Sequence, residues 1–155
     1  MKTAEDILLD KKGTLVFVSI DQTIIQALEL MVKYRIGAVL VKNGDDIVGI
    51  WTERDFLRNS ITPGFEPHSE LVGKYMSSPL HTAPHDATIT TLEEMFIGLF
   101  VRHIPITKGE RFIGMVSIGD VLRANLLEKD RQIKDLNSLA SWQYYENWGW
   151  DRKKR

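Results

Sequence analysis

The sequence predicts an α+β fold built from two copies of one β-α-β-β-α unit. Three observations predict it. A shift of 65 positions aligns one half of the chain with the other without a gap. Each half combines short extended apolar runs with an amphipathic helical segment, and each carries a strand followed by G-x-x-[ST]-x-x-D. A duplicated unit fixes the architecture before any single motif is interpreted.

Identical residues at corresponding positions establish the repeat. They are Asp21 and Asp86, Thr23 and Thr88, Ile24 and Ile89, Gly44 and Gly109, Gly49 and Gly114, Asp55 and Asp120, and the pairs Leu57-Arg58 and Leu122-Arg123. Positions that differ mostly keep their apolar character, as in Val39 and Ile104. The second half is therefore a copy of the first.

Each copy opens with an extended segment and one amphipathic helix. The extended segments cover residues 15–20 and 80–84, and Asp21 or Asp86 is expected to cap the helix that follows. The apolar stripes of the two helices are Ile24, Ala27, Leu28, Met31 and Val32, and Ile89, Leu92, Met95, Phe96 and Leu99. These stripes indicate faces that pack on a core.

A hairpin and a second helix complete each copy. Apolar runs at residues 36–41 and 47–51 flank a turn that contains Asn43-Gly44, and Lys108-Gly109-Glu110 forms the turn of the second copy. Thr52 and Ser117 are then expected to cap the last helix of each copy.

The predicted organisation is repeat 1 at residues 1–62, a linker at 63–69, repeat 2 at 70–127, and a helical, aromatic-rich extension at 128–155. The linker follows from two prolines and a glycine near residues 63–67. One copy of about 60 residues buries little surface alone. We therefore expect the two copies to pack sheet to sheet as one body.

Composition narrows the classes of function. Twenty basic and 21 acidic residues leave a net charge of −1, so no global field gathers nucleic acid or an anionic membrane. The chain has no cysteine and no apolar run of membrane-spanning length, which together predict a cytoplasmic protein.

The repeated G-x-x-[ST]-x-x-D motif has two compatible interpretations. As a capping box, the Ser/Thr and Asp side chains satisfy backbone N–H groups at the start of the helix. As a ligand site, the carboxylate accepts both hydrogens of a ribose cis-diol, and the hydroxyl and helix N–H groups meet a phosphate.

The whole pattern resembles a tandem pair of cystathionine β-synthase (CBS) domains, known as a Bateman module, of the stand-alone bacterial type. The resemblance covers residues 3 to about 128 and rests on five segments in order, at residues 18–23, 36–41, 49–55, 102–106 and 114–120. It implies two clefts between the copies for an adenosine-containing ligand: AMP, ADP, ATP or NAD(H). Carried over, Asp55 and Asp120 would bind ribose, with Thr52 and Ser117 beside them.

The two clefts should differ in charge. Arg102 and His103 open the second hairpin, where the first copy has Gly37 and Ala38. Arg54 would add a phosphate contact in the first copy. Each of these three basic side chains could instead be a solvated or packing residue.

The sequence shows no catalytic or metal-binding constellation. His68, His81 and His85 lack the spacing of a metal motif, and there is no nucleophile elbow or Gly-rich phosphate loop. We therefore expect no enzyme activity, no catalytic cofactor and no metal. An enzyme using Asp55 or Asp120 stays as a minor alternative.

The C-terminal extension departs from the minimal module. An apolar pattern continues the last helix through Leu126, Ile133, Leu136, Leu139 and Ala140. Beyond it, Trp142, Tyr144, Tyr145, Trp148 and Trp150 precede the basic end at residues 152–155. Such aromatics indicate an interface, with a homodimer preferred and a protein target as a second partner. Nucleic acid and membranes are not expected partners.

The leading hypothesis is a regulatory module that senses adenosine nucleotides, and thereby energy state, through a change of shape or of partner contacts. The alternative is a structural or adaptor protein with vestigial clefts that acts through its aromatic tail. The sequence leaves open which adenosine ligand binds and which partner is regulated.

Overall fold

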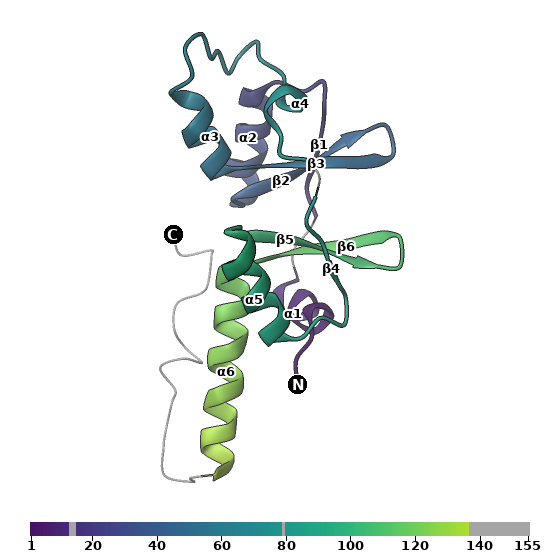
Figure 1. The fold of residues 1–155 in the computed structure, drawn as a ribbon, viewed down its shortest axis with the longest axis vertical. Coiled ribbons are helices and arrows are strands. Elements are labelled where there is room, and N and C mark those ends of the chain that lie inside the picture. Colours follow the sequence, from purple (N-terminus) through teal and green to yellow (C-terminus); the bar gives the residue numbers. More distant parts are fainter. Residues whose placement is uncertain (13–14, 79, 137–155) are drawn as a thin grey trace. The chain divides into compact units, whose positions relative to one another are not determined.

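The computed structural model describes residues 1–12, 15–78 and 80–136 (Figure 1). Its elements, in chain order, are α1 (Ala4–Lys11), β1 (Phe17–Ser19), α2 (Ile24–Tyr34), β2 (Ala38–Asn43), β3 (Asp46–Thr52), α3 (Glu53–Ser60), α4 (Val72–Tyr75), β4 (Ala83–Pro84), α5 (Ile89–Leu99), β5 (His103–Lys108), β6 (Arg111–Ser117) and α6 (Ile118–Leu136). Two runs of β-α-β-β-α, β1 to α3 and β4 to α6, confirm the predicted repeat.

The chain forms two compact units. The first-repeat unit is Leu15–His81, and the second-repeat unit comprises the described residues of Met1–Thr14 and Thr82–Arg155. The N-terminal helix therefore belongs with the second repeat, and α4 belongs with the first. The repeat ranges 1–62 and 70–127 expected from the sequence remain predictions.

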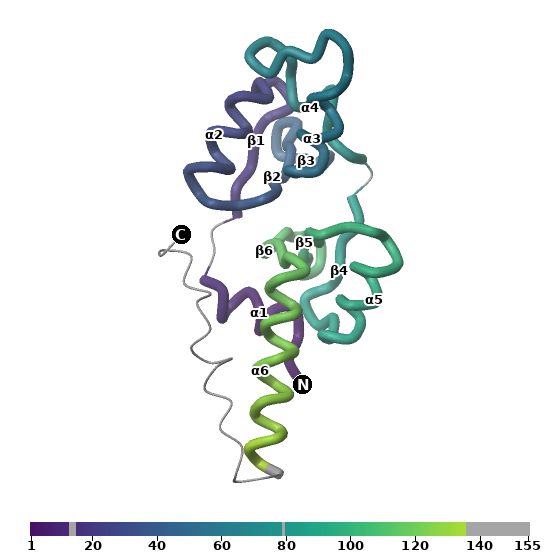
Figure 2. The backbone as a smooth tube through the Cα atoms, turned by 90° about the vertical axis from the view of Figure 1, so that its left-hand side faces the viewer, coloured from purple at the N-terminus to yellow at the C-terminus, as the bar shows by residue number. Residues whose placement is uncertain are grey.

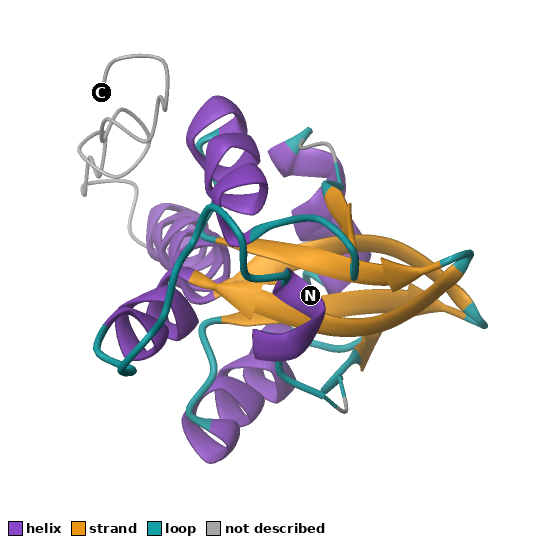
Figure 3. Cartoon of the chain, turned by 90° about the horizontal axis from the view of Figure 1, so that it is seen from above, coloured by secondary structure: helices purple, strands orange, loops and turns teal. Residues whose placement is uncertain are grey.

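Each unit contains a three-stranded mixed sheet, drawn in orange in Figure 3. In the first-repeat unit β1 runs parallel to β2, and β2 runs antiparallel to β3. The second-repeat unit repeats this order with β4, β5 and β6. Gly44 and Gly109 begin the hairpin turns with φ of 64° and 62°, a backbone conformation that glycine adopts without strain.

The helices after the first strands begin later than predicted. The N-caps of α2 and α5 are Thr23 and Thr88, which accept from the N–H groups of Gln26 and Thr91. The expectation of Asp21 and Asp86 as caps was wrong. Two residues separate each aspartate from the first helical turn, and Gln26 completes a capping box with Thr23 that excludes Asp21.

Each unit has its own hydrophobic core. Ile24, Ala27 and Met31 of α2 are buried with Trp51 of β3 in the first-repeat unit. Ile89, Leu92 and Phe96 of α5 are buried in the second-repeat unit. Most of the predicted stripes are thus confirmed. Val32 and Leu99 are errors, because these residues, close to the ends of their helices, are 78% and 37% exposed.

Each unit also includes a short helix that precedes the other repeat in the sequence. The helix α1, before repeat 1, lies in the second-repeat unit, and α4, before repeat 2, lies in the first-repeat unit. In the second-repeat unit the N–H groups of Ala4 and Glu5 donate to Ala87 and His85 oxygens at 2.8 and 2.9 Å. In the first-repeat unit the N–H groups of Val72 and Gly73 donate to Gln22 and Ile20 at 2.8 and 3.2 Å. Gln22 and Ile20 are the repeat equivalents of Ala87 and His85, so α1 and α4 occupy corresponding places.

The motif glycines allow this close packing. A Cβ on Gly114 would lie 2.6 Å from Leu8 Cδ2, and a Cβ on Gly49 would lie 2.5 Å from Met76 Sδ. Figure 2 follows α1 beside the second repeat's own elements. Gly49 therefore marks where the residues that follow α4 cross β3, and Gly114 marks where α1 crosses β6.

The last helix continues beyond the second repeat, as predicted, from Ile118 to Leu136. The rest of the extension, including Leu139, Ala140, Trp142, Tyr144, Tyr145, Trp148, Trp150 and the basic end, lies outside the described residues. The interface expected there remains a prediction.

Candidate ligand site

The first candidate turn joins β3 to α3. The Asp55 carboxylate folds back on the helix start: its Oδ2 accepts the Thr52 N–H at 2.9 Å and the Thr52 hydroxyl at 3.0 Å. The Asp55 N–H in turn donates to Thr52 Oγ1 at 3.2 Å. This is a complete capping box. It holds Asp55, which is 9% exposed, in one position.

The start of β2 lies against the same turn. Ala38 pairs with Thr52 across the hairpin and is fully buried. The carbonyl of Gly37 accepts the Glu53 N–H at 3.0 Å and so satisfies the first helical donor of α3. The structure therefore brings Gly37, Ala38, Thr52 and Asp55 together within the first-repeat unit.

The second turn, from β6 to α6, repeats this arrangement. Asp120 Oδ2 accepts the Ser117 N–H at 2.8 Å, and the Asp120 N–H donates to Ser117 Oγ at 3.1 Å. His103 pairs with Ser117 across the hairpin, and the Arg102 carbonyl accepts the Ile118 N–H at 2.9 Å. Arg102, His103, Ser117 and Asp120 thus form a second group.

Lys11, which sequence reasoning missed, distinguishes the second turn. Its ammonium lies 2.7 Å from Asp120 Oδ2 and donates to the Met115 carbonyl at 3.3 Å. The two side chains are 23% and 14% exposed, so the pair is largely shielded from water. No motif marks Lys11, because it reaches Asp120 only through the packing of α1 on the second repeat.

Burial and the polar neighbours of Asp120 shift its pKa in opposite directions. Burial is the largest single effect and would raise the pKa. The charge and hydrogen bond of Lys11, together with the hydrogen bonds of Ser117, outweigh burial and hold the pKa below its ordinary value. Asp120 is therefore an ionised carboxylate at neutral pH.

The basic side chains predicted for phosphate contacts differ in exposure. Arg54 on α3 and Arg102 before β5 are exposed, whereas His103 at the start of β5 is half-buried. Arg54 belongs to the first turn, and Arg102 and His103 belong to the second. All three lie beside a helix start, where the backbone N–H groups favour an anion.

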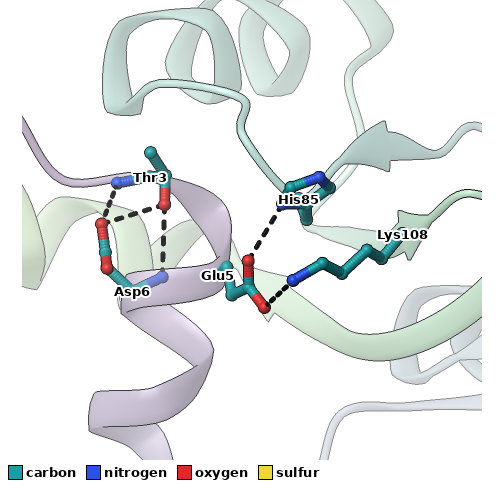
Figure 4. Close-up of polar contacts among 5 residues, drawn as sticks. All are labelled: Thr3, Glu5, Asp6, His85 and Lys108. Carbon is teal, nitrogen blue, oxygen red and sulfur yellow. Dashed lines mark hydrogen bonds and ion pairs between the residues drawn. The ribbon is translucent and has the colours of Figure 1, made fainter.

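A polar cluster fixes α1 on the second repeat (Figure 4). Glu5 contacts His85 Nδ1 through Oε2 at 2.9 Å and Lys108 Nζ through Oε1 at 2.7 Å. The hydrogen bond from Lys108 is the main cause that lowers the pKa of the Glu5 carboxyl. Beside it, Thr3 and Asp6 form the capping box that starts α1.

The remaining histidines do not gather. His85 is held by Glu5, and His68 lies 3.1 Å from Glu66. Among the residues that the structure describes, no three His, Asp or Glu side chains are placed to hold a metal ion. Within the same residues, no helix is long and apolar enough to cross a membrane.

Curated relatives match most of the chain. The mitochondrial CBS domain-containing protein CBSX3 of Arabidopsis thaliana is 34% identical over 137 residues, which are 85% of this chain and 66% of that protein. The A-adding tRNA nucleotidyltransferase of Geobacter sulfurreducens is 26% identical over 91% of this chain. The chain spans only 15% of that enzyme, and so it corresponds to a part of it.

Solved structures agree with the fold. A CBS-domain containing protein from Agrobacterium tumefaciens has a TM-score of 0.74 at 31% identity, covering 79% of this chain and 98% of that one. A protein with CBS domains from Burkholderia ambifaria has a TM-score of 0.78 at 28% identity, covering 83% of this chain and 96% of that one. The CBS domain profile matches residues 4–61 and 72–126. The chain therefore belongs to the CBS domain family and carries two CBS domains in tandem.

Proposed function

We propose that this chain is a regulatory module that binds an adenosine-containing ligand, AMP, ADP, ATP or NAD(H), at its two strand-to-helix turns. Pairs of CBS domains are regulatory, ligand-binding modules. The single observation that carries the proposal is the carboxylate held at the start of α3 and again at α6. A fixed carboxylate beside a helix start suits a ligand that has a diol at one end and an anion at the other.

The geometry of Asp55 supports a ribose contact. Its Oδ2 is used by the capping box, whereas its Oδ1 accepts no hydrogen bond from the residues that the structure describes. The second oxygen is therefore the acceptor for a ribose hydroxyl. The cap and the ligand contact use different oxygens, so local stability and binding are compatible.

A structural neighbour supports the class of ligand. A CBS domain protein of Pyrobaculum aerophilum was solved in complex with AMP, and it shares this fold with a TM-score of 0.70. Its identity to this chain is 22%, so the neighbour supports the fold and makes AMP the first ligand to test.

The phosphate end of the ligand would face the basic residues of each turn. Arg54 would contact the phosphate at the first turn, and Arg102 and His103 would do so at the second. The first copy has Gly37 and Ala38 at the positions of Arg102 and His103. A helix start adds favourable N–H groups for an anion. We expect the number of phosphates preferred to differ between the turns for this reason.

The proposed role is regulation without catalysis. The ligand must favour one arrangement of the protein, because equal affinity for two states shifts no equilibrium. We further propose a cytoplasmic homodimer that reports adenylate levels to a protein target, with no nucleic acid, membrane or catalytic cofactor involved.

Calorimetric titration with AMP tests the assignment of both turns. Asp55→Ala and Asp120→Ala should each weaken binding at one turn by about 1–3 kcal/mol, through loss of charge-assisted hydrogen bonds. Asp55→Asn guards against misfolding because the amide oxygen can still accept the Thr52 N–H. Asp45→Ala in the exposed hairpin turn is the control. Unchanged affinity in all the Asp55 and Asp120 variants would refute the site.

A further inference from the structure

The two motif carboxylates have different partners. Asp120 Oδ2 accepts both the Ser117 N–H at 2.8 Å and the Lys11 ammonium at 2.7 Å. Asp55 Oδ2 accepts only the two donors of Thr52, and within the described residues Asp55 makes no ion pair. Among the residues that the structure describes, a cation therefore lies on the carboxylate of the second turn and none lies on that of the first.

The sequence explains this difference. A shift of 68 positions relates α1 to α4, since it pairs Ala4 with Val72 and Leu8 with Met76, which cross the equivalent glycines. The same shift pairs Lys11 with Pro79. Proline is uncharged, so the first turn has no lysine at the sequence position that corresponds to Lys11.

The packing of α1 holds the Lys11 ammonium in a fixed position. Ala4 and Ile7 are 0% and 4% exposed in the core of the second-repeat unit, and Leu8 lies on Gly114. Glu5 binds His85 and Lys108 at the other end of the helix. Lys11 is in the last turn of this anchored helix, and its contact with the Met115 carbonyl holds it at the end of β6.

Lys11 and the capping box both use Asp120 Oδ2, so a sugar hydroxyl would take the other oxygen, as proposed for Asp55. We propose that Lys11 is an internal partner of Asp120 that competes with the sugar for the charge of this one carboxylate, because an ammonium that neutralises the charge at Oδ2 makes the carboxylate a weaker acceptor for a nucleoside. The inference rests on the proposed function. It makes the first turn the stronger nucleoside site and couples occupancy of the second to the end of α1.

Titration with adenosine tests the competition, because adenosine has the ribose and the base but no phosphate for a lysine to attract. The experiment uses the full chain carrying Asp55→Asn, which removes the ionised acceptor of the first turn. Adding Lys11→Met keeps the apolar stem and removes the charge. Adenosine should then bind about fivefold more tightly, the factor that corresponds to about 1 kcal/mol for one ion pair.

Matched variants separate this effect from others. Lys12→Met removes the neighbouring charge, which is exposed, and should leave adenosine affinity unchanged. Lys11→Gln should repeat the gain of Lys11→Met if the charge is responsible. Hydrogen exchange at the last turn of α1 should also quicken on addition of adenosine to the unmodified chain, since a sugar hydrogen bond to the same carboxylate weakens its ion pair with Lys11.

The outcomes distinguish the two proposals. Tighter adenosine binding in both Lys11 variants supports the competition. Unchanged or weaker adenosine binding, with binding to the parent intact, overturns the role of Lys11 and leaves the nucleotide site standing. No binding of adenosine or AMP to any variant or to the unmodified chain contradicts the proposed function and this inference with it.

Discussion

At the residue scale, the same side chains serve the fold and the proposed ligand. Thr52 and Asp55 satisfy the first backbone donors of α3, and Ser117 and Asp120 do so for α6. The sequence predicted both caps because the [ST]-x-x-D spacing is a local pattern. It could not predict Lys11, which approaches Asp120 from 109 residues away in the sequence.

Thr52→Ala should lower the free energy of unfolding of the first-repeat unit by about 1 kcal/mol, because the N-cap oxygen and its hydrogen bond to the Asp55 N–H are lost. Thr52→Ser keeps the hydroxyl and should retain most of the stability. Urea denaturation followed by tryptophan fluorescence measures both, and equal losses in the two variants would contradict the role of the hydroxyl.

Acid should weaken the second-repeat unit through Asp120. Its folded pKa lies below the ordinary value near 3.9, so the unfolded chain takes up this proton more readily. The stabilisation is complete above the unfolded pKa and is lost as the pH falls through the folded pKa. Urea denaturation between about pH 5 and pH 2 should show this loss.

Lys11→Met should make that acid dependence shallower, since the charge that lowers the pKa of Asp120 is gone. Lys12→Met is the control for a general change in charge and should keep the slope of the unmodified chain. The same slope in both variants would show that Lys11 does not set the pKa of Asp120.

At the element scale, regular periodicity made the helices α2 and α5 and the two hairpins predictable, with boundaries within a few residues. The helices α1 and α4 were not predicted. They are short, with 8 and 4 residues, and their place depends on packing against the other repeat's strands. A local pattern carries no information about that partner, although the repeated glycines mark the points of contact.

Substitution of Gly49 and Gly114 tests how closely other segments pack on β3 and β6. Gly49→Ala would place a Cβ 2.9 Å from the Ser77 carbonyl oxygen, a backbone atom that cannot rotate away. Gly114→Ala would press on the methyl groups of Leu8, the end of a flexible side chain. We therefore expect Gly49→Ala to lower the melting temperature more than Gly114→Ala does.

Gly98→Ala is the matched control. Gly98 is in α5, and a Cβ there would meet nothing within 4 Å. Alanine favours a helix over glycine by about 1 kcal/mol, so this variant should melt higher than the parent. A loss of stability in Gly98→Ala comparable to that in Gly49→Ala would mean that steric crowding is not the cause.

At the scale of the whole molecule, each compact unit contains a segment from before the other repeat. Ile7 of α1 is 4% exposed in the core of the second-repeat unit. Ile7→Ala should therefore cost about 2–4 kcal/mol there. Amide hydrogen exchange should quicken in α5, β5 and β6 while β2 and β3 keep their protection. The reverse pattern would contradict the assignment of α1 to the second repeat.

Thermal unfolding of the purified protein with AMP, ADP, ATP, NAD, NADH or GMP is the first experiment to show whether the chain binds adenosine-containing ligands. A ligand at 100 times its Kd stabilises the native state by about 2.7 kcal/mol, which raises the melting temperature measurably. We expect the melting temperature to rise with one or more adenosine compounds and to rise less with GMP. No rise with any of them at millimolar concentration would mean that the chain is not an adenosine-nucleotide sensor.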